Sequence, residues 1–386
     1  MSERHAVVAD NVFDGVSLRR DAAVVVEGDV ILAVVGKGEL PSTMRTEALP
    51  PGAWLAPGFI DIQVNGGGDV LLNDQPSPEG IRAIVRAHRR FGTTAMMPTL
   101  ISDTREKMAA AIDAVQAGMA DEPGVIGLHL EGPFLSRGKP GVHDPAMLRQ
   151  PDDADRALLT ARRKGALLVT LAPEEVSDAF VKDLVRAGAR VALGHSMATY
   201  AQTRAAMAAG LTGFTHLFNA MRPLTARDPG PIAAALESKN ACYGLIVDGV
   251  HVDPAVLRLA LRGAGRPILV TDAMPPVGGE RPGFRLYGND IEVRDGRCQR
   301  SDGTLAGSAL TMAQAVRNCV QMLGVPLTDA LRFAAAHPAD FLGVSDRLGR
   351  LWPKHRADMV AFEPDTVNVL STWVAGGKAS ELRDAA

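Results

Sequence analysis

The sequence predicts a (β/α)₈ barrel of the TIM type with a small β-sandwich domain, and three observations favour this fold class. From about residue 57, apolar strands alternate with Ala-, Arg- and Leu-rich helical stretches, and eight such strands occur. Both ends of the chain are short strands broken by turns, as in "AAVVVEGDVILAVV" and "RADMVAFEPDTVNVL". No GxGxxG or Walker-type phosphate loop favours a doubly wound open sheet. That open sheet remains the alternative, because periodicity alone cannot show that a sheet closes.

The expected barrel strands are apolar runs that finish in polar residues. They cover 58–65, 94–100, 125–132, 166–173, 190–196, 213–218, 242–249 and 267–274. After the eighth run, "FRLYGNDIEVRDGRCQ" predicts a hairpin excursion with an Asp-Gly turn. The two ends of a barrel domain can lie close together, so the terminal strands can share one domain. We therefore expect residues 1–55 and 346–386 to form the sandwich and 56–345 the barrel.

Composition and charge exclude several classes of partner. The chain is 46% hydrophobic and 22% charged with a net charge of −3, and it has no basic block that would suit nucleic acid. No apolar run approaches the ~20 residues that span a bilayer, and "MSERHAVVAD" lacks the features of a signal peptide. The three cysteines, Cys242, Cys298 and Cys319, are scattered and form no metal-type pair. We expect a cytoplasmic protein without nucleic-acid or membrane partners.

Polar residues stand at the carboxyl ends of the expected strands, where the active site of such a barrel lies. A carboxylate on a buried strand, such as Glu131, is costly unless it is paired or coordinated. Together with His195 and His216 it offers the three-ligand set of a catalytic metal site that leaves a position for water. Asp272 is a candidate acid or base near the barrel axis. The full set of strand-end residues is Gln63, Asn65, Thr99, Glu131, His195, His216, Asp248 and Asp272.

Each of these residues also has a structural interpretation when it is taken alone. A strand-end histidine can be a hydrogen-bonded core residue, Glu131 can pair with a buried arginine, and Asp272 can cap a helix or turn. The metal site is favoured because four such residues fall at equivalent positions of four different strands. His129 faces the same side as Glu131 one pleat deeper, which indicates support or packing rather than ligation.

Three further residues lie in loops that follow the expected strands. "KPGVHDP" presents His143, "DGVHVDP" presents His251, and "MRPLTARDPGP" presents Arg227. Loops on a rigid scaffold commonly carry binding residues. An arginine and a histidine over the barrel mouth would suit an anionic group such as a phosphate, although a solvated arginine is the commoner case.

Seven motifs then carry a resemblance: "PGFIDIQVNG", "LHLEGPFL", "LGHS", "THLFNAM", "DGVHVDP", "LVTDAM" and "LAGS". In this order they resemble the N-acetylglucosamine-6-phosphate deacetylase family of the amidohydrolase superfamily, over about residues 55–310. The resemblance implies a metal-dependent (β/α)₈ hydrolase. Its expected reaction is hydrolysis of the N-acetyl group of N-acetyl-D-glucosamine 6-phosphate to D-glucosamine 6-phosphate and acetate, in amino-sugar catabolism.

The resemblance also implies residue roles. Glu131, His195 and His216 would bind one divalent cation per subunit, zinc or alternatively iron, with Asp272 as catalytic acid and base. His143 would hydrogen-bond the acetyl carbonyl. Part of the phosphate site can come from a neighbouring subunit in this family, which implies a homodimer or higher homo-oligomer. The implied substrate site comprises Gln63, His143, Asn219, Ala220, Arg227, His251, Leu305, Ala306, Gly307 and Ser308.

One position departs from the wider superfamily, in which a His-x-His at the end of the first strand serves a second metal. Here the same place reads Gln63-Val64-Asn65. Amides are poor zinc ligands beside imidazole, so we expect a single-metal site. Two alternatives stay open: a different amidohydrolase, such as a dihydroorotase-like enzyme, and a scaffold that has lost its chemistry. A dihydroorotase-like enzyme generally uses the His-x-His and a bridging lysine, which this chain lacks. In a scaffold without chemistry we would expect at least one of Glu131, His195, His216 and Asp272 to be replaced, and all four are present.

Overall fold

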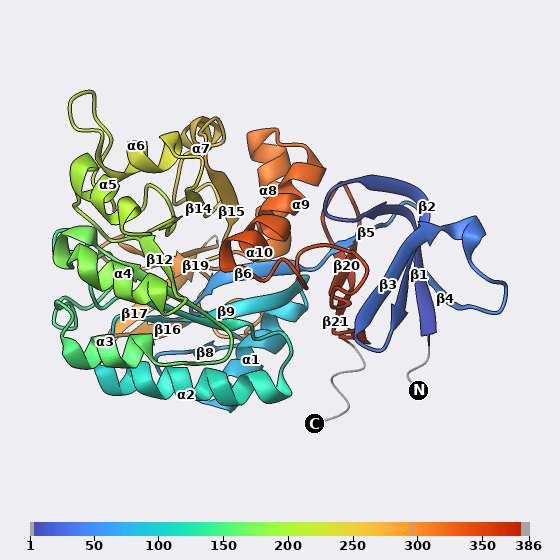
Figure 1. The fold of residues 1–386 in the computed structure, drawn as a ribbon, viewed down its shortest axis with the longest axis horizontal. Helices are drawn as coiled ribbons and strands as arrows, with labels where there is room; N and C mark the ends of the chain where they lie inside the picture. The colour runs from blue at the N-terminus through green and yellow to red at the C-terminus, as the bar shows by residue number, and fades with distance from the viewer. Residues whose placement is uncertain (1–3, 295, 380–386) are drawn as a thin grey trace. The chain divides into compact units, whose positions relative to one another are not determined.

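The computed structural model describes residues 4–294 and 296–379, which fall into two compact units (Figure 1). One unit holds the described residues up to Asp61, His88–Ala95 and those from Thr311 onward, and the other holds Ile62–Ala87 and Met96–Leu310. The domain boundaries expected from the sequence, at 55/56 and 345/346, stay predictions. Residues 1–3 and 380–386 of the expected sandwich lie outside the described residues.

Eight strands form the barrel sheet, and the neighbouring strands from β9 to β15 run parallel. Their burial explains their apolar sequences, because the strands of such a sheet are covered on both faces. In sheet order from one end to the other they are β6 (Phe59–Val64), β9 (Thr93–Ile101), β10 (Gly127–Glu131), β11 (Ala166–Leu171), β12 (Arg190–Leu193), β13 (Gly213–Phe214), β14 (Cys242–Leu245) and β15 (Arg266–Leu269).

A short seam of hydrogen bonds joins the first strand of this sheet to the segment that follows the last. The Asp272 N–H donates to the Gln63 carbonyl at 3.0 Å, and the Asn65 N–H donates to the Ala273 carbonyl at 2.9 Å. Val64 and Ala273 form a parallel bridge between these two bonds. The sheet therefore closes on itself, which confirms the predicted barrel and excludes the doubly wound alternative.

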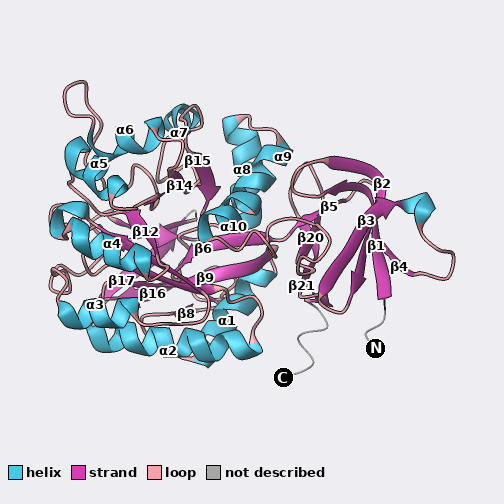
Figure 2. Ribbon diagram, in the orientation of Figure 1, coloured by secondary structure: helices cyan, strands magenta, loops and turns pink. Residues whose placement is uncertain are grey.

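Helices surround the strands, as Figure 2 shows in cyan. Several helices begin where a polar side chain accepts a hydrogen bond from a backbone N–H of the first turn. Thr104 caps α2 in this way, Ser177 caps α4 and Thr199 caps α5. The helices between the barrel strands are α1 (Pro78–Arg89), α2 (Arg105–Asp121), α3 (Asp153–Thr160), α4 (Asp178–Arg186), α5 (Tyr200–Ala208), α6 (Gly230–Glu237) and α7 (Pro254–Ala260). None of the helices among residues 4–294 and 296–379 has both the length and the apolar character needed to cross a bilayer.

Four of the expected strand ranges, 190–196, 213–218, 242–249 and 267–274, are too long. The strands β12 to β15 end at Leu193, Phe214, Leu245 and Leu269. Three candidate site residues therefore lie in loops just beyond a strand, and each has a positive φ: 48° at His195, 31° at His216 and 52° at Asp272. A left-handed residue cannot continue a strand, so the regular hydrogen bonding stops before the site.

A four-stranded antiparallel sheet follows β15 and confirms the expected excursion. Asp295 of the expected Asp-Gly turn lies outside the described residues. The sheet buries an apolar cluster that includes Leu286, Ile291, Cys298 and Ala306 against residues of the barrel unit, among them Val142. Its strands are β16 (Gly283–Leu286), β17 (Asn289–Arg294), β18 (Arg297–Gln299) and β19 (Leu305–Ser308), and a smaller pair is formed by β7 (Gly66–Gly67) and β8 (Val70–Leu71).

The other unit joins both ends of the chain in one sheet, which confirms the expected small β domain. Strand β5 near the N-terminal end pairs antiparallel with β20 near the C-terminal end. Two separate apolar clusters lie among its alternating residues, one around Val7, Val24 and Trp373 and the other around Ala6 and Val25. Its elements are β1 (Arg4–Phe13), β2 (Leu18–Glu27), β3 (Val30–Gly36), β4 (Arg45–Ala48), β5 (Trp54–Pro57), β20 (Met359–Phe362), β21 (Val369–Val374), β22 (Gly377–Lys378), α8 (Met312–Leu323), α9 (Leu327–Ala334) and α10 (Ala336–Leu342).

The packing of β10 against β11 makes a prediction about stability. A Cβ on Gly127 would lie 2.1 Å from the Ala166 carbonyl oxygen, so Gly127→Ala should lower the free energy of unfolding by about 1–3 kcal/mol. The control is Gly118→Ala within α2, where the new Cβ would meet Ile81 at 3.5 Å. This control should raise the same quantity by about 0.5–1 kcal/mol. Urea unfolding measures both variants, and a change of the same sign in both would contradict this packing.

Candidate metal centre and active site

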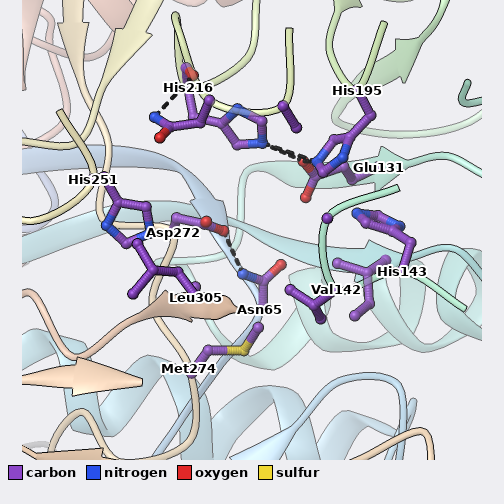
Figure 3. Close-up of a pocket in the computed structure, with 15 residues that line it drawn as sticks. Asn65, Glu131, Val142, His143, His195, His216, His251, Asp272, Met274 and Leu305 are labelled. Atoms are coloured by element: carbon purple, nitrogen blue, oxygen red, sulfur yellow. Dashed lines mark hydrogen bonds and ion pairs between the residues drawn. The ribbon is translucent and has the colours of Figure 1, made fainter. Parts of the chain in front are cut away.

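Three side chains converge at the carboxyl ends of β10, β12 and β13 (Figure 3). Oε1 of Glu131 lies 2.9 Å from Nε2 of His216 and 3.2 Å from Nε2 of His195, and the two Nε2 atoms are 3.1 Å apart. All three residues are buried, and their ligand atoms lie within 4.8 Å of one another. The predicted ligand set is thus brought together in space.

Within this cluster, the atoms that can accept a hydrogen bond outnumber the protons that are available to them. Nδ1 of His195 lies 3.0 Å from the Lys139 carbonyl oxygen, which can only accept, so Nδ1 carries the proton and Nε2 of the neutral ring has a lone pair. The Glu131 carboxylate is also an acceptor. Nδ1 of His216 is buried and has no hydrogen-bond partner among the described residues. Two imidazole nitrogens and a carboxylate oxygen of this kind fit a divalent cation.

Two opposing effects set the charge of the Glu131 carboxyl group. Burial raises its pKa, but the two facing imidazoles outweigh burial and hold the pKa well below its ordinary value. Burial likewise lowers the pKa of His216, and the hydrogen bond and charge of Glu131 reverse this so that the pKa is raised. The carboxylate therefore stays ionised in the buried site, as a metal ligand must.

Asp272 lies beside this cluster and is held by two amide groups. Nδ2 of Asn65 donates to its Oδ1 at 2.7 Å, and Nε2 of Gln63 donates to the same oxygen at 3.1 Å. The Gln63 amide also reaches Oε2 of Glu131 at 3.3 Å, so it bridges the two carboxyl groups. Burial and the negative charge of Glu131 raise the pKa of Asp272 to about 6. A carboxyl group with such a pKa can accept and return a proton near neutral pH.

His143 faces the same pocket, and its contacts with Ser102 define which ring nitrogen carries the proton. The Ser102 backbone N–H donates to Nδ1 at 3.3 Å, and its hydroxyl lies 2.8 Å from the same atom. Because Nδ1 accepts, the proton of the neutral ring is on Nε2. Burial and the nearby His195 lower the pKa of His143 well below its ordinary value. The ring is thus a neutral hydrogen-bond donor.

The predicted catalytic and ligand residues line one open pocket of about 620 Å³. Figure 3 shows the polar side chains around it, with His251 and Asp272 on one side and Glu131, His143 and His195 on the other. The predicted residues that line the pocket are Glu131, His143, His195, His216, Asn219, Ala220, His251, Asp272, Leu305 and Gly307. The lining also includes Asn65, Ile101, Gly141, Val142 and Met274, which were not predicted as substrate contacts.

Four predicted substrate residues do not line this pocket, and their assignments stay predictions. Gln63 lies behind Asp272, where it bridges the carboxyl groups. Ala306 is buried in the apolar cluster of the excursion. Ser308 supports the loop after β15, because its hydroxyl donates to the Thr271 carbonyl at 2.6 Å and its N–H donates to the Asp272 carbonyl. Arg227 is exposed in the loop before α6.

Two residues from the strand-end set support their neighbours instead of lining the pocket. Asp248 accepts from Nδ1 of His251 at 2.6 Å and from its backbone N–H at 2.9 Å, which orients that imidazole toward the pocket. The Thr99 hydroxyl lies 3.3 Å from Nδ1 of His129, and Nε2 of the same ring lies 2.7 Å from the Thr170 hydroxyl. His129 is therefore part of a buried polar layer below the ligands, in agreement with its predicted supporting place.

Sequence reasoning missed the apolar wall and the residue that holds His143. Ile101, Val142 and Met274 are apolar residues among many, and nothing in their types distinguishes a pocket wall from core packing. Ser102 directly follows the end of β9, and a polar residue at that position was a usable signal. His143 was found, but the serine that defines its proton was not.

Comparison with known proteins adds to this geometry. Residues 54–381 match the amidohydrolase family. The chain belongs to this family. The chain is a metal-dependent amide hydrolase of the amidohydrolase type, a family that implies a divalent metal, and Glu131, His195 and His216 form the candidate site for it. The alternative of a scaffold without chemistry has no support, since all three ligands and Asp272 are in place.

Two curated relatives and one solved structure illustrate the similarity. An N-acetylgalactosamine-6-phosphate deacetylase of Shewanella sp. (strain ANA-3) is 44% identical over 83% of this chain and 82% of its own length. An N-acetylglucosamine-6-phosphate deacetylase of Haemophilus influenzae is 33% identical over 97% of this chain and 98% of its own. The crystal structure of the N-acetylglucosamine-6-phosphate deacetylase from Pasteurella multocida matches with a TM-score of 0.94 at 35% identity, covering 97% and 99% of the two chains.

The ligand set makes a prediction about metal content. Glu131→Gln should remove almost all of the divalent metal that the unaltered protein binds, because a neutral amide replaces the carboxylate of the candidate ligand. The melting temperature should fall as well, since a metal that binds only the folded form stabilises it. Elemental analysis of the purified protein measures the first effect. His355→Asn is the control, because this buried histidine hydrogen-bonds the Ser345 carbonyl and should leave the metal in place. Full metal occupancy in Glu131→Gln would contradict the ligand assignment.

Proposed function

We propose that this chain hydrolyses the N-acetyl group of N-acetyl-D-glucosamine 6-phosphate to give D-glucosamine 6-phosphate and acetate. The observation that carries the proposal is the pocket in which Glu131, His195 and His216 face Asp272 and His143. The names of the relatives from Haemophilus influenzae and Pasteurella multocida support the substrate. The same names support a role in amino-sugar metabolism. We assign one divalent ion per subunit to the three ligands, zinc with iron as the alternative.

The chain's own residues divide the reaction between them. Glu131, His195 and His216 would hold a divalent cation, which would supply Lewis acidity and a water of lowered pKa next to the acetyl carbonyl. Asp272 accepts the proton of that water and passes it to the departing amine, because an amide nitrogen does not leave as an anion. Gln63 and Asn65 keep the Asp272 carboxyl group in place for both transfers. The single proton that Asp272 gains is the one it returns, so the residue ends as it began.

His143 would stabilise the carbonyl oxygen as negative charge develops on it. Its neutral ring has the proton on Nε2, and such a donor stabilises an oxyanion by roughly 3 kcal/mol in comparable sites. The remote end of the substrate would be held by His251, Asn219, Ala220 and Arg227, with Leu305 and Gly307 along the sugar. Binding energy at the phosphate then serves to orient the reacting carbon.

The assembly and setting are part of the same proposal. We assign the exposed Arg227 to a phosphate contact, in its own pocket or in that of a neighbouring subunit. A site shared in this way makes a homodimer or higher homo-oligomer the working unit. The three cysteines are all buried, which suits a reducing, cytoplasmic compartment.

A second candidate substrate is N-acetyl-D-galactosamine 6-phosphate. The observation that favours it is the 44% identity to the Shewanella protein of that name, against 33% for the Haemophilus influenzae protein named for the glucosamine derivative. The two sugars differ in the orientation of one hydroxyl group. The chemistry of Asp272 and the metal ligands is the same for both, so the walls of the pocket decide between them.

The deciding experiment measures acetate release from both sugar phosphates with the purified, metal-loaded protein. Release from N-acetylglucosamine 6-phosphate that is lost on chelation and restored by zinc supports the first proposal. A higher kcat/KM for the galactosamine derivative would move the assignment to the second. No acetate from either compound would refute the deacetylase assignment, while elemental analysis would still report on the metal site.

The pKa of Asp272 makes a prediction about the pH profile. The residue must be ionised to accept a proton, so kcat/KM should fall as the pH drops through its pKa. That pKa is raised to about 6, and a bound cation lowers it, so the acid limb should lie at pH 6 or below. Asp272→Asn should keep its metal and lose kcat by roughly 100- to 10,000-fold. An acid limb a full unit higher, or a nearly active Asp272→Asn, would remove Asp272 from this role.

Arg227 makes a separate prediction about substrate binding. Arg227→Ala should raise KM for the phosphorylated sugar roughly 10- to 100-fold, as expected for loss of a charged hydrogen bond. It should leave the KM for unphosphorylated N-acetylglucosamine almost unchanged. Arg262→Ala is the control, because Arg262 is an exposed arginine just after α7 that does not line the pocket. Equal effects of Arg227→Ala on both sugars would argue against a phosphate contact.

A further inference from the structure

Ser102 occupies a position between the pocket and the excursion sheet. On one side its hydroxyl lies 2.8 Å from Nδ1 of His143 and its N–H donates to the same atom at 3.3 Å. On the other side its carbonyl oxygen accepts from the Tyr287 hydroxyl at 2.5 Å. Ser102 is only 1% exposed, so neither set of bonds competes with bulk water. One residue therefore links the excursion to the ring of His143.

The backbone next to the metal ligand Glu131 leaves room for this serine. A Cβ placed on Gly132 would lie 2.2 Å from Oγ of Ser102, a distance that no packed side chain allows. Gly132 also has a φ of +90°, which glycine adopts without strain. The glycine of the "LEGPF" motif thus provides the space in which the Ser102 hydroxyl meets His143.

The excursion holds the same region at a second point. Tyr287 stands at the turn between β16 and β17, and burial raises the pKa of its hydroxyl, which therefore remains a donor to Ser102. Nη2 of Arg300 donates to the Val142 carbonyl at 3.0 Å, one residue before His143. Val142 packs in the apolar cluster of the excursion. The β16–β19 sheet therefore contacts both the backbone before His143 and the residue that hydrogen-bonds its ring.

We propose that Ser102 is a positioning residue that holds His143 as a neutral Nε2–H donor toward the pocket, and that the β16–β19 sheet fixes Ser102 through Tyr287. The catalytic part of this inference rests on the proposed function, in which His143 donates to the acetyl carbonyl. The structural part, the position of the proton on the ring, does not depend on any substrate.

The first test reads the proton directly in the zinc-loaded protein. ¹⁵N-labelled histidine gives ring signals that can be assigned to His143 by their loss in His143→Gln. In the wild type, Nε2 should carry the proton and Nδ1 should show an acceptor's shift. Ser102→Ala removes the hydroxyl and keeps the backbone N–H, so it should move the Nδ1 signal to that of a more weakly bonded acceptor, and Ser102→Thr, which keeps a hydroxyl, should restore it. Tyr287→Phe should move the signal in the same direction to a smaller extent.

The second test follows turnover at saturating N-acetylhexosamine 6-phosphate. Ser102→Ala should lower kcat roughly three- to tenfold, the effect of one hydrogen bond, with KM changed less than about twofold. Ser102→Thr should recover most of the loss. Tyr243→Phe is the matched control for Tyr287→Phe, because Tyr243 is also buried and donates its hydroxyl to a backbone carbonyl, that of Ala260 at 2.9 Å. This control should leave kcat and the His143 signals unchanged.

The outcomes distinguish the role of Ser102 from the deacetylase assignment. An unchanged His143 spectrum in Ser102→Ala overturns the inference, whatever the activity. A changed spectrum with wild-type kcat overturns it too, because the hydroxyl contact with the His143 ring would then have no bearing on catalysis. A changed spectrum in a protein that releases no acetate in any form upholds the role of Ser102 on the ring and refutes the deacetylase assignment. If Ser102→Ala does not fold, Ser102→Thr and Tyr287→Phe carry the same comparison.

Discussion

The barrel closes through backbone hydrogen bonds at Asp272, and the candidate active site depends on this seam. The Asp272 N–H is bonded to Gln63, and its carbonyl accepts from Ser308. Bonds on both sides fix where the carboxyl group of Asp272 can lie. Because alternate residues of a strand face the same side, Gln63 and Asn65 then both direct their amides to it. A shift of one residue in this pairing would turn both amides away, so the pairing that closes the barrel also sets the surroundings of the Asp272 carboxyl group.

Two buried carboxyl groups with different charge states follow from that geometry. The two imidazoles keep Glu131 ionised, while burial and the charge of Glu131 raise the pKa of Asp272. The Gln63 amide lies between them and satisfies both. Environments that push two pKa values apart assign one group to a permanent charge and the other to proton transfer. The amides at the end of β6 thus support the carboxyl group of Asp272, the proposed acid–base group.

The fold and the clustering of the candidate ligands could be predicted from the sequence, because both follow from periodicity. Apolar runs of strand length separated by helices predict the barrel, and polar residues that end those runs predict Glu131, His195, His216 and Asp272. The strand ends could not be predicted, because the positive φ angles at three of these residues leave no mark on residue type. The proton on His143 was equally inaccessible, since it depends on Ser102, a contact between residues 41 positions apart. Apolar pocket walls such as Met274 look like core in any sequence.

The metal ligands and the pocket walls come from different parts of the chain. Glu131 ends β10, and His195 and His216 lie just beyond β12 and β13, whereas Leu305 and Gly307 belong to β19 of the excursion. The excursion shares its apolar cluster with Ile101, Val142 and Met274 of the pocket wall, so substitutions in it can reshape that wall from outside the barrel strands. Where a pocket wall is carried by one segment and the candidate ligands are carried by others, the wall can vary in shape independently of the ligand positions.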